Sequence, residues 1–110
     1  MSYQHGQLAA GRWAKMPLVE QMANIGSEIE RALGWRSKGS DAHARKAFER
    51  ALELIDLTLG SSKRSAVLKE LARLREAVID YFAGDNEYKS SDSSWRRYFL
   101  HFVYACRKNT

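Results

Sequence analysis

Four stretches of the chain repeat apolar residues at intervals of three and four, and this spacing restricts the fold more than any other feature. In the first stretch the repeat comprises Leu18, Met22, Ile25, Ile29, Ala32 and Leu33. Comparable repeats run between Ala44 and Leu59, between Val67 and Phe82, and between Trp95 and Cys106. Because this interval places side chains on one face of an α-helix, we predict four amphipathic helices in an all-α fold.

Helix-ending and helix-capping residues separate these stretches. Pro17 suits the first position of a helix, where its missing amide hydrogen is no loss. Gly39 lies beyond the end of that helix, Ser40 or Asp41 can cap the next one, and Gly60 follows the second apolar repeat. A polar segment over residues 85–94 precedes the fourth helix. Helices joined by such short connections pack as a four-helix up-down bundle, which is the architecture we predict.

The length of 110 residues fits one domain. We predict that residues 1–16 form a short flexible lead-in, because they show no clear period, and that residues 17–110 form the single helical-bundle domain. Trp13 and Met16, at the end of the lead-in, are expected to pack against the bundle.

Composition narrows the location of the protein more than its function. The formal net charge of +5 permits an acidic partner without requiring one. Cys106 is the only cysteine, so no intrachain disulfide can form, which fits a reducing compartment. The sequence has no apolar run of signal-peptide or membrane-span length. We therefore expect a cytoplasmic protein with no membrane association.

The last predicted helix carries a basic row. Arg97, His101, Tyr104 and Lys108 follow one another at helical spacing and share a face. Cations combined with a stackable ring suit a surface that binds phosphate or RNA, so Arg97, Tyr104 and Lys108 are candidate binding residues. The alternative is a solvated helix end, where cations interact favourably with the helix dipole.

The same segment contains an arginine and a histidine separated by four residues, Arg96 and His101. This spacing resembles the motif of HEPN domains, small and often homodimeric helical bundles, many of which are metal-independent ribonucleases of toxin–antitoxin and defence systems. The resemblance implies that His101 is the general acid/base and that Arg96 binds the scissile phosphate. Residues five apart on a helix diverge by about 140°, so Arg97 is the same-face partner of His101.

Arg75 lies inside the apolar arc of the third predicted helix. A buried guanidinium is costly unless it is paired, so we predict an internal salt bridge with Glu28 as the partner. The alternatives are a charge at a subunit interface or one that binds a ligand carboxylate or phosphate. Glu53 and Asp56 form a Glu-x-x-Asp pair that resembles part of the metal site of all-α nucleotide pyrophosphohydrolases, but the first helix lacks the Glu-x-x-Glu that this family uses with it. We therefore expect no metal site and no cofactor.

These observations favour a small helical-bundle interaction module, self-associating as a homodimer and able to take an RNA or protein partner. The apolar arc of the second helix is wide, because Ala47, Leu54 and Leu57 broaden it, and it suggests two neighbours or a second subunit. No complete catalytic set is present, so an enzyme is not expected. The alternative is a HEPN-type endoribonuclease with His101 and Arg96 at its site. A basic bundle that binds nucleic acid without cutting it is a third reading.

Overall fold

The computed structural model describes residues 6–108, with side chains from Gly11 to Arg107, and this part of the chain contains five helices and no strand. The helices are α1 (Gly6–Lys15), α2 (Leu18–Ser37), α3 (Asp41–Ser61), α4 (Ser65–Ala83) and α5 (Asp92–Lys108). The predicted all-α class is confirmed. None of the five helices is both long enough and apolar enough to span a membrane.

The difference from the expected helices lies at the N-terminal side. α1 occupies ten residues of the segment predicted as a flexible lead-in, while residues 1–5 lie outside the described part. A helix this short is marginal on its own propensity, and packing supplies its stability. Trp13 provides that packing, since only 7% of it is exposed. Its predicted contact with the bundle is thus confirmed.

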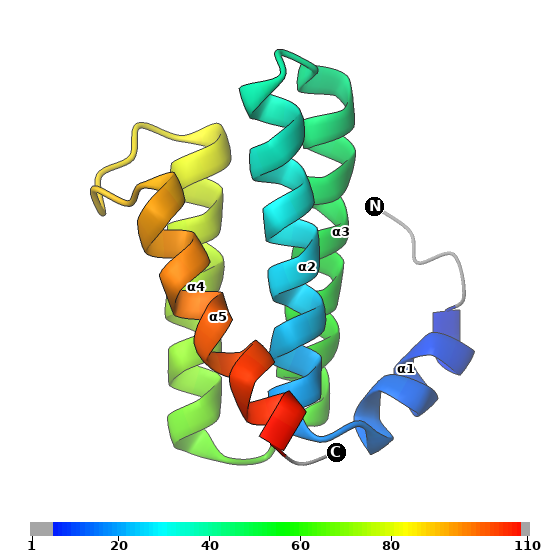
Figure 1. The fold of residues 1–110 in the computed structure, drawn as a ribbon. Coiled ribbons are helices and arrows are strands. Elements are labelled where there is room, and N and C mark those ends of the chain that lie inside the picture. The colour runs from blue at the N-terminus through cyan, green and yellow to red at the C-terminus, as the bar shows by residue number, and fades with distance from the viewer. Residues whose placement is uncertain (1–5, 109–110) are drawn as a thin grey trace.

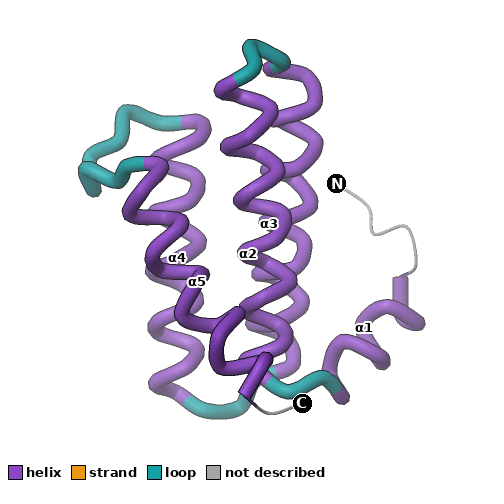
Figure 2. Tube along the Cα trace, viewed as in Figure 1, coloured by secondary structure: helices purple, strands orange, loops and turns teal. Residues whose placement is uncertain are grey.

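The helices α2 to α5 begin and end close to the residues that the sequence indicated. α2 starts directly after Pro17, α3 directly after Ser40, and α4 ends before Gly84. Figure 1 shows α2 and α4 running in one direction and α3 and α5 in the other, with α1 set beside the lower end. Short loops join the helix ends (Figure 2).

α2 is central to the packing. It packs against α3 on one side and α5 on the other, and α3 also contacts α1 and α4. The broad apolar arc of α3 is therefore used within the chain, where Leu54 and Leu57 lie half-buried against the core. The core itself draws on every helix, with Trp13, Met22, Ile25, Ile29, Leu33, Ile55, Leu71, Val78, Trp95 and Phe99 among its members.

One glycine sets how closely α5 approaches α2. A Cβ atom added at Gly26 would lie 2.8 Å from the Cβ and ring carbon Cγ of Phe99. That separation is shorter than carbon atoms tolerate, so only glycine permits this crossing. The Phe99 ring in turn stacks on Trp95, with ring centroids 6.1 Å apart. The α2–α5 contact thereby fixes the side chains of α5 that face the core.

A buried polar network holds α1. The Trp13 indole Nε1–H donates to Thr58 Oγ1 over 2.9 Å, and the Thr58 hydroxyl donates to the Leu54 carbonyl over 2.7 Å. Gln21 Nε2 donates to the Trp13 carbonyl over 2.7 Å. Each of these buried donors has an acceptor, as burial requires. α1 is thus tied to α2 and α3 through its last turn.

A second network fixes the start of α5. The Tyr81 hydroxyl on α4 donates to Asp92 Oδ1, and Arg36 Nη2 at the end of α2 lies 3.3 Å from the same oxygen. The Arg36 guanidinium also lies over the Tyr81 ring, 4.6 Å from its centroid. Burial, and then the bond to Asp92, raise the pKa of Tyr81. Three helices therefore meet at Asp92, which sets the register of α5 beside α4.

Candidate functional site

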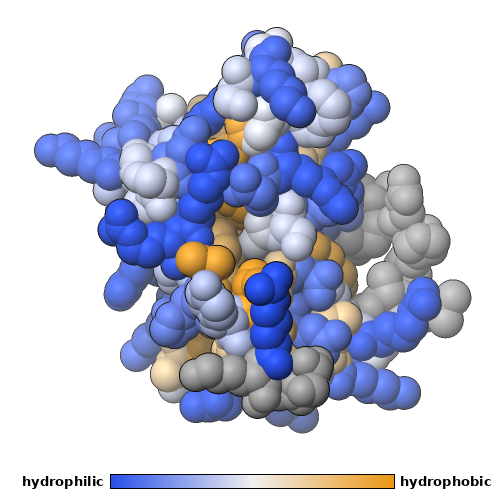
Figure 3. Space-filling model, in the orientation of Figure 1, coloured by the Kyte–Doolittle hydropathy of each residue, from blue (hydrophilic) through white to orange (hydrophobic). Residues whose placement is uncertain are grey.

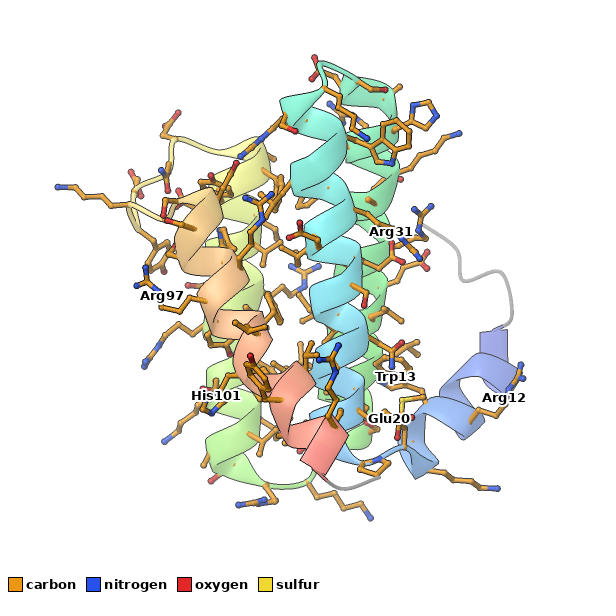
Figure 4. The ribbon with its side chains drawn as sticks, viewed as in Figure 1. Arg12, Trp13, Glu20, Arg31, Arg97 and His101 are labelled. Carbon is orange, nitrogen blue, oxygen red and sulfur yellow. The ribbon has the colours of Figure 1, made fainter. Side chains whose placement is uncertain are left out.

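Three residues of the predicted basic row lie on the exposed surface of α5. Arg97, His101 and Tyr104 are exposed, Tyr104 to 58%. Figure 4 shows Arg97 and His101 projecting from successive turns of α5. Lys108 is the last residue of that helix, and its side chain lies outside the described residues. The helical period thus places the described members of the row on one face.

Two adjoining hollows lie between this face of α5 and α4. The first has a volume of about 610 Å³ and is lined by Glu70, Ser94, Arg97, Tyr98, His101 and Phe102. The second, of about 490 Å³, shares Glu70 and Tyr98 and adds Ala66, Lys69, Arg73, Leu74, Ala77 and Trp95. We call the two together the α4/α5 hollow. Volumes of this size are typical of small-molecule sites.

The charge of the α4/α5 hollow is predominantly positive. Lys69 and Arg73 come from α4, Arg97 comes from α5, and Glu70 is the one carboxylate among the residues that line it. Neither arginine forms an ion pair with any side chain of residues 11–107. Five other arginines of the described chain are paired with carboxylates: Arg31, Arg36, Arg50, Arg75 and Arg96. The hollow therefore presents cations available to an anionic ligand.

Tyr98 and Glu70 form the wall that the two hollows share. Burial, with a smaller contribution from the Glu70 charge, raises the pKa of the Tyr98 phenol to about 12. The phenol thus stays protonated near neutral pH and can donate a hydrogen bond. Among the described side chains, none donates a hydrogen bond to the Glu70 carboxylate. The carboxylate is therefore an acceptor available to a ligand.

Arg96 lies on another side of α5. Its Nε donates to Glu30 on α2, 3.0 Å from Oε2, and this hydrogen bond raises the pKa of the guanidinium. Arg96 borders the groove between α2 and α5, whereas His101 borders the α4/α5 hollow. Within one chain, Arg97 rather than Arg96 shares a hollow with His101, as the helical period predicts.

Arg75 is paired, but not as the sequence suggested. Its Nε donates to Asp56 Oδ1 over 2.8 Å, and 39% of its side chain is exposed. The expected partner, Glu28, instead accepts hydrogen bonds from Arg31 and Arg50. The predicted internal salt bridge is therefore present, whereas the burial of Arg75 and its pairing with Glu28 were wrong. The rotation of α4 carries Arg75 to the edge of the apolar arc, beside α3.

The groove between α2 and α5 is more apolar than the α4/α5 hollow. It measures about 820 Å³, and its apolar lining consists of Gly26, Ile29, Leu33, Trp95, Phe99, Leu100 and Val103. Leu100 is 50% exposed there. Figure 3 shows hydrophobic residues gathered over α5 and the adjoining α2, surrounded by hydrophilic surface. We call this depression the α2/α5 groove.

Several hollow residues were absent from the sequence-based candidates. Lys69, Glu70 and Arg73 on α4 and Ser94 on α5 were not singled out. Lys69 and Arg73 follow the i, i+4 spacing of one helical face, which was the available signal. Among the described residues, no group of three His, Cys, Asp or Glu side chains could hold a metal ion.

Comparisons with known proteins identified no relative of this chain. No family model matches the chain, and searches of curated proteins and of solved structures found no match either. The resemblance of Arg96 and His101 to the HEPN motif is therefore still a prediction.

Proposed function

We propose that this protein is a small helical-bundle interaction module that binds RNA at the α4/α5 hollow. The observation that carries the proposal is the set of unpaired cations around that hollow. Arg73 and Arg97 approach it from two helices and have no carboxylate partner among the described side chains. Phosphate oxygens are the partners that such cations take in nucleic-acid complexes.

The aromatic residues of the hollow favour a single strand over a duplex. Tyr98, Phe102 and Trp95 line the hollow, and Tyr104 lies exposed further along α5. Unstacked bases bind by stacking on aromatic rings, while neighbouring cations track the backbone. A base-paired duplex would present its phosphates but keep its bases stacked inside. Trp95 is buried, Tyr98 and Phe102 are half-buried, and Tyr104 is exposed. The combination of cations with these partly exposed rings therefore supports single-stranded RNA as the ligand.

Fluorescence anisotropy with a labelled single-stranded RNA of mixed sequence tests this proposal. At about 50 mM salt we expect binding whose affinity falls steeply as salt rises, since phosphate contacts release counterions. The double variant Arg73→Ala/Arg97→Ala should lose at least about tenfold in affinity and show a shallower salt dependence. The charge-matched control Arg45→Ala/Lys46→Ala removes two exposed cations of α3 outside the hollow. Equal losses in both variants, or no binding at low salt, would contradict the proposal.

Self-association as a homodimer is a second candidate, supported by the α2/α5 groove. The half-exposed Leu100 and the apolar lining there are the kind of surface that protein partners cover. We propose that α2 to α5 act as one four-helix up-down unit in a cytoplasmic protein, with the groove as its contact surface. Sedimentation of the Leu100→Glu variant beside the unmodified protein tests this. A dimer that persists in the variant would exclude the groove as the contact surface between the two copies.

The ribonuclease alternative requires residues from two chains. Arg96 and His101 border different depressions in one chain, so a common phosphate would need Arg96 of one copy and His101 of another. RNA cleavage in excess EDTA, compared with the His101→Ala variant, tests it. Cleavage that survives chelation and disappears in the variant would support the enzyme. An uncut RNA that still binds would support the binding module.

A further inference from the structure

The α4/α5 hollow contains one residue that RNA backbone binding does not explain. Glu70 lies among Lys69, Arg73 and Arg97, and its carboxylate accepts no hydrogen bond from the described side chains. A carboxylate repels phosphate, so its presence weakens any binding that depends on phosphates alone. The same carboxylate would add to the binding of a ligand that brings hydrogen-bond donors to it.

Among the bases, guanine offers the donors that match a carboxylate. Its Watson–Crick edge carries two adjacent donors, the N1–H and the 2-amino group, which can reach both carboxylate oxygens at once. Adenine and cytosine present one amino group next to an acceptor, and uracil presents one N–H between two carbonyls. A carboxylate accepts hydrogen bonds and donates none, so the neighbouring acceptors of those three bases would be repelled.

The walls around Glu70 suit a base held at that position. Tyr98 lines both hollows, and Phe102 adds a second ring beside Glu70 in the first. Rings of this kind stack on unpaired bases. The first hollow, at about 610 Å³, has the volume of a small-molecule site. Arg97 and His101 lie on the same hollow, where they can meet the phosphates that flank the base.

We propose that the α4/α5 hollow selects a guanine base within single-stranded RNA, with Glu70 accepting hydrogen bonds from its Watson–Crick edge and Arg73 and Arg97 contacting the flanking phosphates. This inference rests on the RNA-binding function proposed above and names its preferred base. In this proposal Glu70 distinguishes between bases, and the cations provide affinity for RNA of any sequence.

Labelled oligouridines that differ at one central base test the proposal by anisotropy. The central base is guanine, hypoxanthine, adenine or uracil. For the unmodified protein we expect guanine to bind about tenfold more tightly than uracil or adenine, in line with a good bidentate contact. Hypoxanthine keeps the N1–H but lacks the 2-amino group, so its affinity should lie between those of guanine and uracil.

The variant Glu70→Gln separates base selection from backbone binding. It should remove the guanine preference while leaving the affinity for the all-uridine strand unchanged or higher, because a negative charge is lost. Glu49→Gln, which alters an exposed carboxylate of α3, should keep the preference. Both positions are exposed, so neither change is expected to unfold the protein.

The outcomes distinguish the two proposals. If all oligonucleotides bind equally and Arg73→Ala/Arg97→Ala still weakens them, guanine selection is overturned and RNA binding stands. If none binds, both are overturned. Guanosine monophosphate carries one phosphate where the strand offers one on each side of the base, so it should displace the guanine strand only at much higher concentration. Displacement at equal concentration would assign the hollow to a free nucleotide and overturn RNA as its ligand.

Discussion

Two buried tryptophans show how differently the two sides of this molecule are built. Trp13 and Trp95 are 7% and 6% exposed. The Trp13 indole N–H donates to Thr58, whereas the Trp95 indole N–H has no acceptor among the described residues. Trp13 lies in a closed network, while Trp95 borders both the α2/α5 groove and the α4/α5 hollow.

The difference indicates separate roles for the two regions. Leaving a buried donor without an acceptor costs about 1–3 kcal/mol. Proteins tend to break such local rules at functional sites and to satisfy them elsewhere. We call the network of Trp13, Gln21 and Thr58 the α1 anchor; its donors all have acceptors, and it contributes stability. On the Trp95 side, a buried donor has no acceptor among the described residues, and it lies beside the depressions to which we assign binding.

Truncating Trp13 should have the largest effect on stability. Trp13→Ala removes the buried ring and its hydrogen bond to Thr58, so we expect a loss of about 3–5 kcal/mol in the free energy of unfolding. Urea unfolding followed by circular dichroism measures it. Arg12→Ala, at the exposed preceding residue, should change stability by less than about 0.5 kcal/mol. A loss below about 1 kcal/mol for Trp13→Ala would mean that α1 is not anchored as described.

Disturbing the close contact between Gly26 and Phe99, beside Trp95, should have the next largest effect on stability. Gly26→Ala places a methyl group 2.8 Å from Phe99, and forcing the two helices apart should cost about 1–3 kcal/mol. Gly34→Ala, in the same helix but with no atom within 4 Å of the added carbon, should be neutral or stabilise by up to about 1 kcal/mol. Equal urea midpoints for the two variants would contradict the contact.

Replacing each tryptophan by phenylalanine compares the two indoles directly. Trp13→Phe loses a hydrogen bond, but Trp95→Phe loses none to the described residues. We therefore expect Trp13→Phe to be the more destabilising by about 1 kcal/mol. The double variant Trp13→Phe/Thr58→Val should lose less free energy of unfolding than the sum of the two single losses, because both changes break the same hydrogen bond. If Trp95→Phe were the costlier change, the contrast between the two sites would be refuted.

The smallest expected effect concerns the pH dependence at Tyr98. Its pKa rises from 10.0 to about 12 on folding, chiefly through burial. The folded state therefore holds this proton more tightly, and the resulting stability is present below pH 10 and lost as pH rises toward about 12. Tyr98→Phe should show a shallower alkaline decline in urea midpoint between about pH 9 and 11. Parallel profiles for the two proteins would show that Tyr98 is not buried as described.

The sequence predicted most of the bundle because its information there is local. Apolar spacing and capping residues located α2 to α5 to within a few residues. α1 was missed because Trp13 stabilises it through residues far along the chain, such as Thr58. The apolar spacing within a segment does not predict a contact with a residue so far along the chain.

The candidate site was only half predictable for a related reason. Arg97 and His101 share one face of α5, which follows from helical geometry alone. Lys69, Glu70 and Arg73 join them only because of how α4 is rotated against α5, and a single helix does not encode its neighbour's rotation. The same uncertainty in rotation led to Glu28 instead of Asp56 as the expected partner of Arg75.

The most direct test of the account follows the indole N–H signals of the three tryptophans by ¹H–¹⁵N NMR while guanine-containing single-stranded RNA is added. Trp95 borders the α4/α5 hollow, Trp13 lies in the α1 anchor, and Trp35 is 38% exposed at the end of α2. We expect the Trp95 signal to shift progressively to saturation while those of Trp13 and Trp35 stay in place. An unchanged Trp95 signal in the presence of bound RNA, or a shift confined to Trp13 or Trp35, would contradict it.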